Sequence, residues 1–206
     1  IAMFFTVLLH ATINQNSHKS IKSKLMNINL KTKRLDLKPV SANDIENIYQ
    51  LQCLEETARF NTSAIPNSSN DTKIKVEKWI AENNKENIRQ FTFVVKLIEE
   101  NKFIGLIGLN LGKEHYKNAE VWFQYDFKFW NKGYATESLR EIINFGFENL
   151  KLHRIEAGCA IENLGSINVL EKVGMLREAH TRKLLPLKSV WSDNYGYAIL
   201  SDDERK

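Results

Sequence analysis

A run of ten residues in the second half of the chain has the composition of an anion-binding turn. Residues 130–139 are Trp-Asn-Lys-Gly-Tyr-Ala-Thr-Glu-Ser-Leu. Gly133 lets the backbone approach a ligand closely, and Ala135 is too small to block that approach. A helix that begins here presents free N–H groups and the positive end of its dipole to whatever lies in front of it. The chemistry expected at this turn is anion binding, and phosphate is the usual occupant.

Regular elements on both sides must hold this turn in place. Residues 120–125 form an alternating apolar segment that predicts a strand. After the turn, Leu139, Ile142 and Ile143 have the spacing of an amphipathic helix. A strand, a glycine turn and a helix also occur in this order as an ordinary connection, so residues further along the chain must decide between the two interpretations.

Further blocks follow at regular spacing. They are residues 152–158 (Leu-His-Arg-Ile-Glu-Ala-Gly), 162–166 (Glu-Asn-Leu-Gly-Ser), 169–175 (Val-Leu-Glu-Lys-Val-Gly-Met) and 190–200 (Val-Trp-Ser-Asp-Asn-Tyr-Gly-Tyr-Ala-Ile-Leu). With the turn, they resemble the GNAT acetyltransferases, and in detail the branch that contains the RimJ and RimL ribosomal-protein N-acetyltransferases. The resemblance covers roughly residues 30–200. Trp130 stands where the wider superfamily has Gln or Arg, as is common in this branch.

The resemblance implies an α/β (α+β) fold, with a single GNAT-like domain in residues 26–206. The central sheet is expected to be mixed, mostly antiparallel and of about seven strands, with helices on both faces. The activity implied is transfer of an acetyl group from acetyl-CoA to a primary amine by direct attack. The acceptor is either a protein N-terminal amine or a small amine such as an amino acid, a polyamine or an antibiotic. A non-catalytic acyl-CoA-binding module is a further alternative.

The resemblance also implies where acetyl-CoA, the co-substrate, binds. The implied cofactor-binding residues are Phe123, Gln124, Tyr125, Trp130, Asn131, Lys132, Gly133, Tyr134, Ala135, Thr136, Asn163 and Ser166. The diphosphate is expected at the turn. In this family the preceding strand diverges from its neighbour, so unpaired backbone N–H groups meet the pantetheine arm and the thioester oxygen. Lys132 either adds charge near the phosphates or is a solvated lysine of the loop.

Three residues are candidates for the catalytic chemistry. Glu120 opens the strand on which acetyltransferases often place a carboxylate base, and an exposed strand-end glutamate is the equal alternative. Many members have a tyrosine acid where this chain has Leu170, so Ser166 is the candidate that would protonate the thiolate, with a helix N-cap as its other interpretation. Asn163 is expected to hydrogen-bond the pantetheine. Glu162 is a weaker candidate base.

Composition and charge argue against several other classes of protein. The 206 residues are 43% hydrophobic and 26% charged, as in one globular domain. Lys19, Lys22 and Lys24 carry three of the four net positive charges, so the remainder is near neutral and gives no support for nucleic-acid binding. No apolar run reaches the length of a membrane span, so no membrane partner is expected. A monomer or a homodimer is expected.

The cysteines and histidines suggest no metal or covalent chemistry. The five histidines are scattered without ligand spacing, so no metal site is predicted. Cys53 and Cys159 form no Cys-x-x-Cys pair and are interpreted as reduced thiols of a cytoplasmic protein. The attack is therefore expected to be direct, without an acyl-cysteine intermediate.

Residues 1–25 lie outside the pattern of the blocks. A short apolar run comes first and basic residues follow it, which is the reverse of a secretory signal peptide. We expect a non-native or disordered N-terminal extension, with a transit peptide as the lesser alternative. Residues 34–40 then predict a first edge strand that ends near Pro39. Acceptor choice is expected to depend on residues 43–79 and on a late loop at residues 184–191.

Overall fold

The computed structural model describes residue 28, residues 30–188 and residues 190–205. The predicted extension, residues 1–25, lies outside the described residues. The strands are β1 (Leu30–Lys31), β2 (Leu35–Pro39), β3 (Gln90–Leu97), β4 (Lys102–Leu111), β5 (Asn118–Tyr125), β6 (Arg154–Ala160), β7 (Leu176–Pro186) and β8 (Trp191–Leu200). The α-helices are α2 (Ile45–Cys53), α3 (Glu55–Ala58), α4 (Ser69–Asn83), α5 (Tyr134–Asn144) and α6 (Leu164–Lys172). Shorter segments are the 3-10 turns η1 (Ala42–Asp44), η2 (Glu114–Tyr116) and η3 (Phe127–Phe129), and η4 (Phe145–Asn149), a π-helical continuation of α5.

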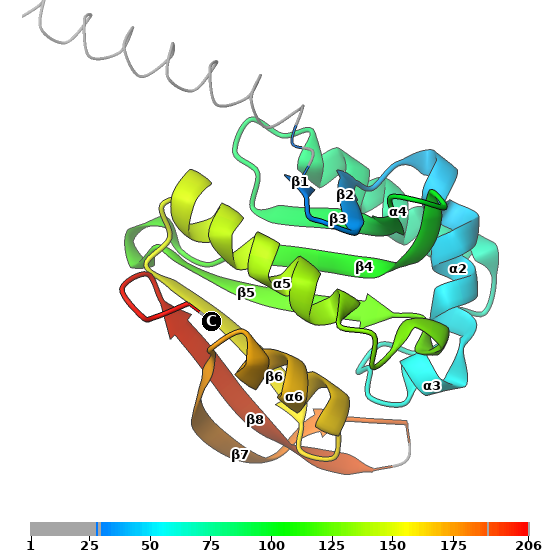
Figure 1. Ribbon diagram of the computed structural model, residues 1–206. Helices are drawn as coiled ribbons and strands as arrows, with labels where there is room; N and C mark the ends of the chain where they lie inside the picture. The colour runs from blue at the N-terminus through cyan, green and yellow to red at the C-terminus, as the bar shows by residue number, and fades with distance from the viewer. Residues whose placement is uncertain (1–27, 29, 189, 206) are drawn as a thin grey trace, which may run out of the picture.

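The strands form one sheet in the order β1-β2-β3-β4-β5-β6-β8-β7 (Figure 1). Of the neighbouring pairs, β5 and β6 are parallel and the others are antiparallel. The predicted α/β (α+β) class and the mostly antiparallel sheet are confirmed. The sheet has eight strands because the two-residue β1 pairs with β2, Leu30 opposite Leu37. The prediction that residues 34–40 form an edge strand is therefore wrong, since β2 lies between β1 and β3.

Helices cover both faces of this sheet and divide its apolar side chains into two cores. Ile107 and Leu109 of β4 belong to the core that also contains Leu139 and Ile142 of α5. Leu106, the residue directly before Ile107, belongs to the core formed with α2 and α4. Because successive side chains of a strand point to opposite faces, α5 lies on one face and α2 and α4 lie on the other. Figure 1 shows α5 crossing in front of β4 and β5.

The one parallel pair opens into a fork. β5 and β6 pair only over Asn118–Glu120 and Arg154–Glu156. Beyond this point β5 stays paired with β4, whereas β6 stays paired with β8, and the two strands diverge (Figure 1). Among the described residues, no strand pairs with the β6-facing edge of residues 121–125. We call this feature the β5–β6 fork; it leaves main-chain groups of β5 without a sheet partner, as the family resemblance led us to expect.

None of the helices in the part of the chain that the structure describes is long and apolar enough to cross a membrane.

Candidate active site

The turn between β5 and α5 has a conformation suited to an anion. Gly133 is the N-cap of α5 and has a φ of 79°, in the left-handed region that glycine adopts without strain. Asn131, two residues earlier, also has a positive φ, of 58°. The first intrahelical bond of α5 runs from Glu137 N to Gly133 O at 3.0 Å. The N–H groups of the preceding residues, Tyr134 to Thr136, have no partner within the helix and remain available to a ligand.

The side chain of Trp130 links the two ends of the segment that leads into the turn, residues 125–130. Trp130 Nε1 donates a hydrogen bond to the Tyr125 carbonyl oxygen at 2.8 Å. The η3 turn lies between these residues, and the Asp126 side chain caps it by accepting from Lys128 N at 3.0 Å. Trp130 as a whole is 43% exposed, so part of the residue is accessible to a ligand although its indole N–H is used within the protein. Lys132 is exposed, with its ammonium 5.4 Å from the centre of the Phe129 ring.

A buried hydroxyl pair joins the end of β5 to the first turns of α5. Tyr125 and Ser138 are both buried, and the Tyr125 hydroxyl is hydrogen-bonded to Ser138 Oγ. Ser138 Oγ in turn donates to Ala135 O at 3.0 Å. Burial raises the pKa of Tyr125 well above its ordinary value, so the phenol stays protonated. The side chain of Tyr125 thus belongs to the core and is not available to a ligand.

Replacing Ser138 by alanine is expected to destabilise the fold by about 1–3 kcal/mol, because the Tyr125 hydroxyl loses its buried partner. Chemical denaturation followed by circular dichroism measures this change. The double variant Tyr125→Phe/Ser138→Ala removes both polar groups and should recover part of the loss. A double variant less stable than Ser138→Ala alone would show that the hydrogen bond is not the source of the effect.

At the fork, polar groups of β5 lack partners among the described residues. Gln124 is half-buried, and its Nε2 is a buried donor with no hydrogen-bond partner among the described residues. Phe123 packs against the core on the α5 side and is also half-buried. Trp122 points to the opposite face, where its ring stacks on Trp79 with centroids 5.8 Å apart. An unsatisfied buried donor beside unpaired backbone is a natural place for a ligand's carbonyl oxygen.

Glu120 lies at the closed end of the fork. It is the last residue of β5 that pairs with β6, opposite Glu156, and it is exposed. Its neighbours Ala119 and Val121 are buried in the core beneath α5. By the alternation of the strand, the Glu120 carboxylate therefore lies on the face that carries α2 and α4. The carboxylate is accessible from solvent and close to the point at which the strands part.

The turn after β6 is organised by Asn163 rather than by Ser166. Asn163 is the N-cap of α6, and its Oδ1 accepts a hydrogen bond from Ser166 N at 3.1 Å. The interpretation of Ser166 as a helix N-cap is therefore wrong. The Ser166 hydroxyl has no hydrogen-bond partner in residues 30–188 or 190–205, and Asn163 keeps its side-chain N–H groups for other acceptors. Leu170, at the position of the family's tyrosine acid, is buried in the core.

A groove of about 590 Å³ joins the turn to three distant segments. It is lined by Glu55, Glu56, Ala58, Arg59, Phe60, Ile65, Trp130, Glu162, Leu187, Lys188 and Val190. These residues come from α3 and the loop after it, from the turn between β5 and α5, from the turn after β6 and from the β7–β8 connection. The volume lies within the usual range of about 300–1,000 Å³ for small-molecule sites. Apart from Trp130 and Glu162, its lining residues fall within residues 43–79 and 184–191, which the sequence analysis associated with the acceptor.

One carboxylate of this groove is anchored from the protein interior. Glu162 Oε2 accepts a hydrogen bond from Ser192 Oγ at 2.6 Å, and Ser192 is buried. Sequence reasoning did not identify Ser192, because nothing near it in the chain indicates that it meets Glu162 30 residues away. The groove therefore presents a positioned carboxylate beside the exposed part of Trp130.

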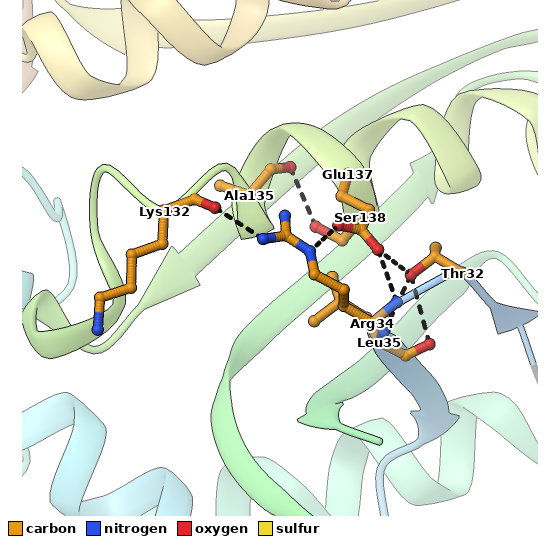
Figure 2. Close-up of polar contacts among 7 residues, drawn as sticks. All are labelled: Thr32, Arg34, Leu35, Lys132, Ala135, Glu137 and Ser138. Carbon is orange, nitrogen blue, oxygen red and sulfur yellow. Dashed lines mark hydrogen bonds and ion pairs between the residues drawn. The ribbon is translucent and has the colours of Figure 1, made fainter. Parts of the chain in front are cut away.

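Further contacts to the turn come from the connection between β1 and β2 (Figure 2). Thr32 and Arg34, in the connection between β1 and β2, bond to Glu137 in the first turn of α5, and Arg34 also reaches Lys132. None of these contacts was predicted. A strand preceded by Thr-Lys-Arg carries no local signal that its arginine will meet residues about a hundred positions later.

The cysteine near the fork is not an available nucleophile. Cys159 is buried, and burial, assisted by the charge of Glu171, raises the pKa of its thiol to about 11. A thiol with this pKa is protonated at neutral pH, whereas only the thiolate attacks a thioester readily. Among the described residues, no group of three or more His, Cys, Asp or Glu side chains is placed to hold a metal ion.

Comparison with known proteins places this site in a family context. Residues 34–176 match the model of the GNAT acetyltransferase domain. The chain is 30% identical over 177 residues to the uncharacterised N-acetyltransferase YnaD of Bacillus subtilis, covering 85% of this chain and 99% of that protein. It is 24% identical over 173 residues to the ribosomal-protein-serine acetyltransferase of Escherichia coli, covering 82% and 94%. The crystal structure of a GNAT-family acetyltransferase from Bacillus anthracis superposes with a TM-score of 0.74 at 31% identity, covering 85% and 100%.

Proposed function

Because this chain belongs to the GNAT acetyltransferase family, we propose that it acetylates a protein N-terminal amine with acetyl-CoA, by direct attack of the amine on the thioester. The observation that carries the proposal is the meeting of two features at Trp130. The turn that begins there suits the diphosphate, and the groove that it lines is open to an acceptor. The E. coli relative acts on ribosomal protein by its name, which supports the choice of acceptor.

The residues of the turn and the fork fit acetyl-CoA. The first-turn N–H groups of α5 and the helix dipole suit the negative diphosphate. The β6-facing edge of residues 121–125 can hydrogen-bond the amides of an extended pantetheine arm. Gln124 Nε2 is a buried donor there that has no acceptor among the described residues. Asn163, with its oxygen used in the cap, adds side-chain N–H donors from the β6 side. Bound acetyl-CoA supplies an activated acyl group whose carbonyl oxygen gains negative charge in the transition state.

The protein's own groups complete the transfer. The bond from the amine nitrogen to the acetyl carbon forms as the carbon–sulfur bond breaks, with the electron pair leaving on sulfur. Glu120 takes the proton that the attacking amine loses, directly or through a water molecule, from its place at the closed end of the fork. Main-chain N–H groups of β5 stabilise the developing oxyanion charge. The free hydroxyl of Ser166 is the donor assigned to the leaving thiolate. Holding both reactants in one site supplies much of the rate.

The acceptor class is tested with a panel of amines. We expect peptides with N-terminal serine or alanine to be acetylated with a kcat/KM at least tenfold above that of spermidine, amino acids or aminoglycosides, since the open groove accommodates an extended chain end. Release of free thiol from acetyl-CoA measures turnover, and mass spectrometry locates the acetyl group. A peptide blocked at its N-terminus is the control. Turnover of polyamines with unmodified peptides would contradict the proposed acceptor.

A small cationic amine is the second candidate, because carboxylates line the groove. Glu55 and Glu56 of α3 and Glu162 face the same space, against the positive charges of Arg59 and Lys188. A polyamine would gain from three carboxylates, whereas a peptide amine needs one. If polyamines are the substrates, Glu55→Gln/Glu56→Gln should raise their KM with little change in kcat. The same variant should leave peptide acetylation almost unaffected.

A further inference from the structure

Arg34 contacts the turn between β5 and α5 through its side chain, although it lies 98 residues before Lys132 in the sequence. Arg34 Nη1 donates to the Lys132 carbonyl oxygen at 3.1 Å. Its Nε donates to Glu137 Oε2 at 2.6 Å, and its guanidinium carbon lies 4.4 Å from the centre of the Tyr134 ring. Figure 2 shows the guanidinium between Lys132 and Glu137. One side chain thus contacts the residue before Gly133, the residue after it and the first turn of α5.

Glu137 is held by three donors from the β1–β2 connection. Thr32 Oγ1 donates to Glu137 Oε1 at 2.5 Å, and Arg34 N donates to the same oxygen at 3.0 Å, in addition to the bond from Arg34 Nε. Burial alone would raise the pKa of Glu137, but these hydrogen bonds outweigh it and the net pKa is lowered. The carboxylate is therefore charged at neutral pH, and its charge is directed to Arg34.

This arrangement removes a competitor for the anion. A carboxylate in the first turn of a helix is attracted to the same N–H groups and the same dipole that would bind a phosphate. With Glu137 bonded to Thr32 and Arg34, its carboxylate is held away from those groups. Arg34 also balances its negative charge, so the potential at the end of α5 stays favourable to an anion.

The contact with Lys132 sets the direction of a neighbouring donor. The described chain has no cis peptide bond, so the carbonyl of Lys132 and the N–H of Gly133 point in opposite directions. Since Arg34 binds that carbonyl from behind, the Gly133 N–H points to the other side of the turn. Because this donor is already oriented, no conformational entropy is lost in ordering it when the ligand binds, and the affinity is higher.

We propose that Arg34, with Glu137 and Thr32, forms a clamp that preorganises the turn for the diphosphate of acetyl-CoA and thereby sets the affinity for this co-substrate. The proposal rests on the proposed function only in that the turn binds the diphosphate. Arg34 is a positioning residue, because it acts through the backbone of Lys132 and through Glu137 and touches neither the thioester nor the acceptor. We call these three residues the Arg34 clamp.

The clamp is tested by measuring binding of CoA and the use of two acetyl donors by Arg34→Met, which keeps an unbranched side chain beside Tyr134. We expect the Kd for CoA and the KM for acetyl-CoA to rise about tenfold or more, as charge-assisted hydrogen bonds are lost. The kcat at saturation should stay within about twofold. With S-acetylpantetheine, which lacks the diphosphate, kcat/KM should not change. A general loosening of the fold would instead lower kcat/KM for both donors.

Two more variants distinguish the effect of the clamp's hydrogen bonds from the effect of positive charge alone. Arg34→Lys keeps the charge but cannot form the planar fork that bonds Lys132 O and Glu137 together, so we expect it to recover little of the CoA affinity. Glu137→Gln keeps an acceptor for Thr32 but weakens the pairing with Arg34, and we expect a smaller loss of affinity than for Arg34→Met. Calorimetry of the ligand-free variants establishes that each is folded before its Kd is compared.

Arg205 provides a matched control, because its side chain contacts the C-terminal end of α5 and the η4 segment that continues it. Its Nη1 donates to Glu148 Oε1 at 3.1 Å and to Asn144 Oδ1 at 2.9 Å, and its guanidinium lies 5.5 Å from the Phe147 ring centre. Arg205→Met loses comparable contacts and should leave the Kd for CoA unchanged. A Kd within twofold of wild type for Arg34→Met, or an equal loss with both donors, would overturn the clamp. Wild-type protein that binds no CoA would overturn it together with the proposed function, whereas CoA binding without acetylation of any amine would contradict the proposed function alone.

Discussion

Replacing Gly133 by glutamate is expected to abolish binding of acetyl-CoA. The residue is the N-cap of α5 at a φ of 79°, where a side chain costs about 1–2 kcal/mol. More important, a Cβ at this position would lie 3.4 Å from Arg34 Nη2, so the new carboxylate competes with Lys132 O and Glu137 for the guanidinium. It also adds negative charge near the end of the helix that must receive the diphosphate, and like charges repel. We expect the affinity to fall at least a hundredfold, which corresponds to about 2.8 kcal/mol.

Thermal denaturation with and without acetyl-CoA measures this loss. A ligand that binds only the folded protein stabilises it by about 2.7 kcal/mol at a hundred times its Kd. For a domain of this size that corresponds to an increase in Tm of roughly 5–10 °C. The wild-type protein should show this shift, whereas Gly133→Glu at the same concentration should gain at most about 0.4 kcal/mol, since the ligand would then be no higher than its Kd.

Gly174 offers a control for the backbone strain of this substitution. It follows α6 and also has a positive φ, of 92°, but it lies outside the turn. Gly174→Glu introduces the same side chain at a similar backbone conformation. It should lower the Tm of the free protein while leaving the shift with acetyl-CoA intact. Loss of the ligand-induced shift in both variants would mean that the effect at Gly133 is general destabilisation.

Replacing Glu120 by glutamine is expected to lower kcat by about 10²–10⁴-fold, the usual contribution of a general base. The amide keeps the shape of the side chain but cannot accept the proton of the attacking amine. The KM for acetyl-CoA should change little, because the diphosphate turn is intact. Raising the pH should narrow the deficit, since an N-terminal amine with a pKa of about 7.7–8.0 loses its proton to solvent. Steady-state kinetics between pH 6 and about 9.5 measure both effects.

A variant of the neighbouring Glu156 distinguishes loss of the general base from loss of negative charge near the fork. It pairs with Glu120 across the parallel ladder, and it is bonded to Arg154 at 2.7 Å and to Asn118 at 3.3 Å. Glu156→Gln removes the same charge next to the fork but not the assigned base, so kcat should stay within a few-fold of wild type. If Glu120→Gln retains full activity while Glu162→Gln loses it, the base is Glu162, held by Ser192.

Local sequence patterns were sufficient to locate the turn. Gly133, the alternation of residues 120–125 and the apolar spacing of α5 each depend on residues within one element, and they placed the start of α5 at the turn. The mostly antiparallel sheet with helices on both faces was implied by the family resemblance that the sequence blocks carry. They did not predict β1, because a two-residue strand has no periodicity to detect.

Choices between equivalent local partners were harder to predict. Both Asn163 and Ser166 are good N-cap residues, and the chain uses Asn163, with the backbone of Ser166 as its partner. The sequence could not decide this, because either residue satisfies the same N–H groups. The outcome leaves the Ser166 hydroxyl without a partner in the described part of the chain, which supports the proposal that it is the proton donor, an interpretation that the sequence alone had left beside the capping role.

The sequence by itself determined the family and its sheet, through the resemblance that its ordered blocks carry, and it located the turn, because hydrophobic periodicity and glycine conformation act over a few residues. Tertiary structure decided what surrounds that turn: Arg34 and Thr32 on Glu137, Ser138 on Tyr125, and Ser192 on Glu162. Each of these contacts joins segments from 13 to about a hundred residues apart, and the pairing is set by strand order and helix packing. A side chain's partner across such distances depends on where the whole sheet places it, and no local pattern encodes that position.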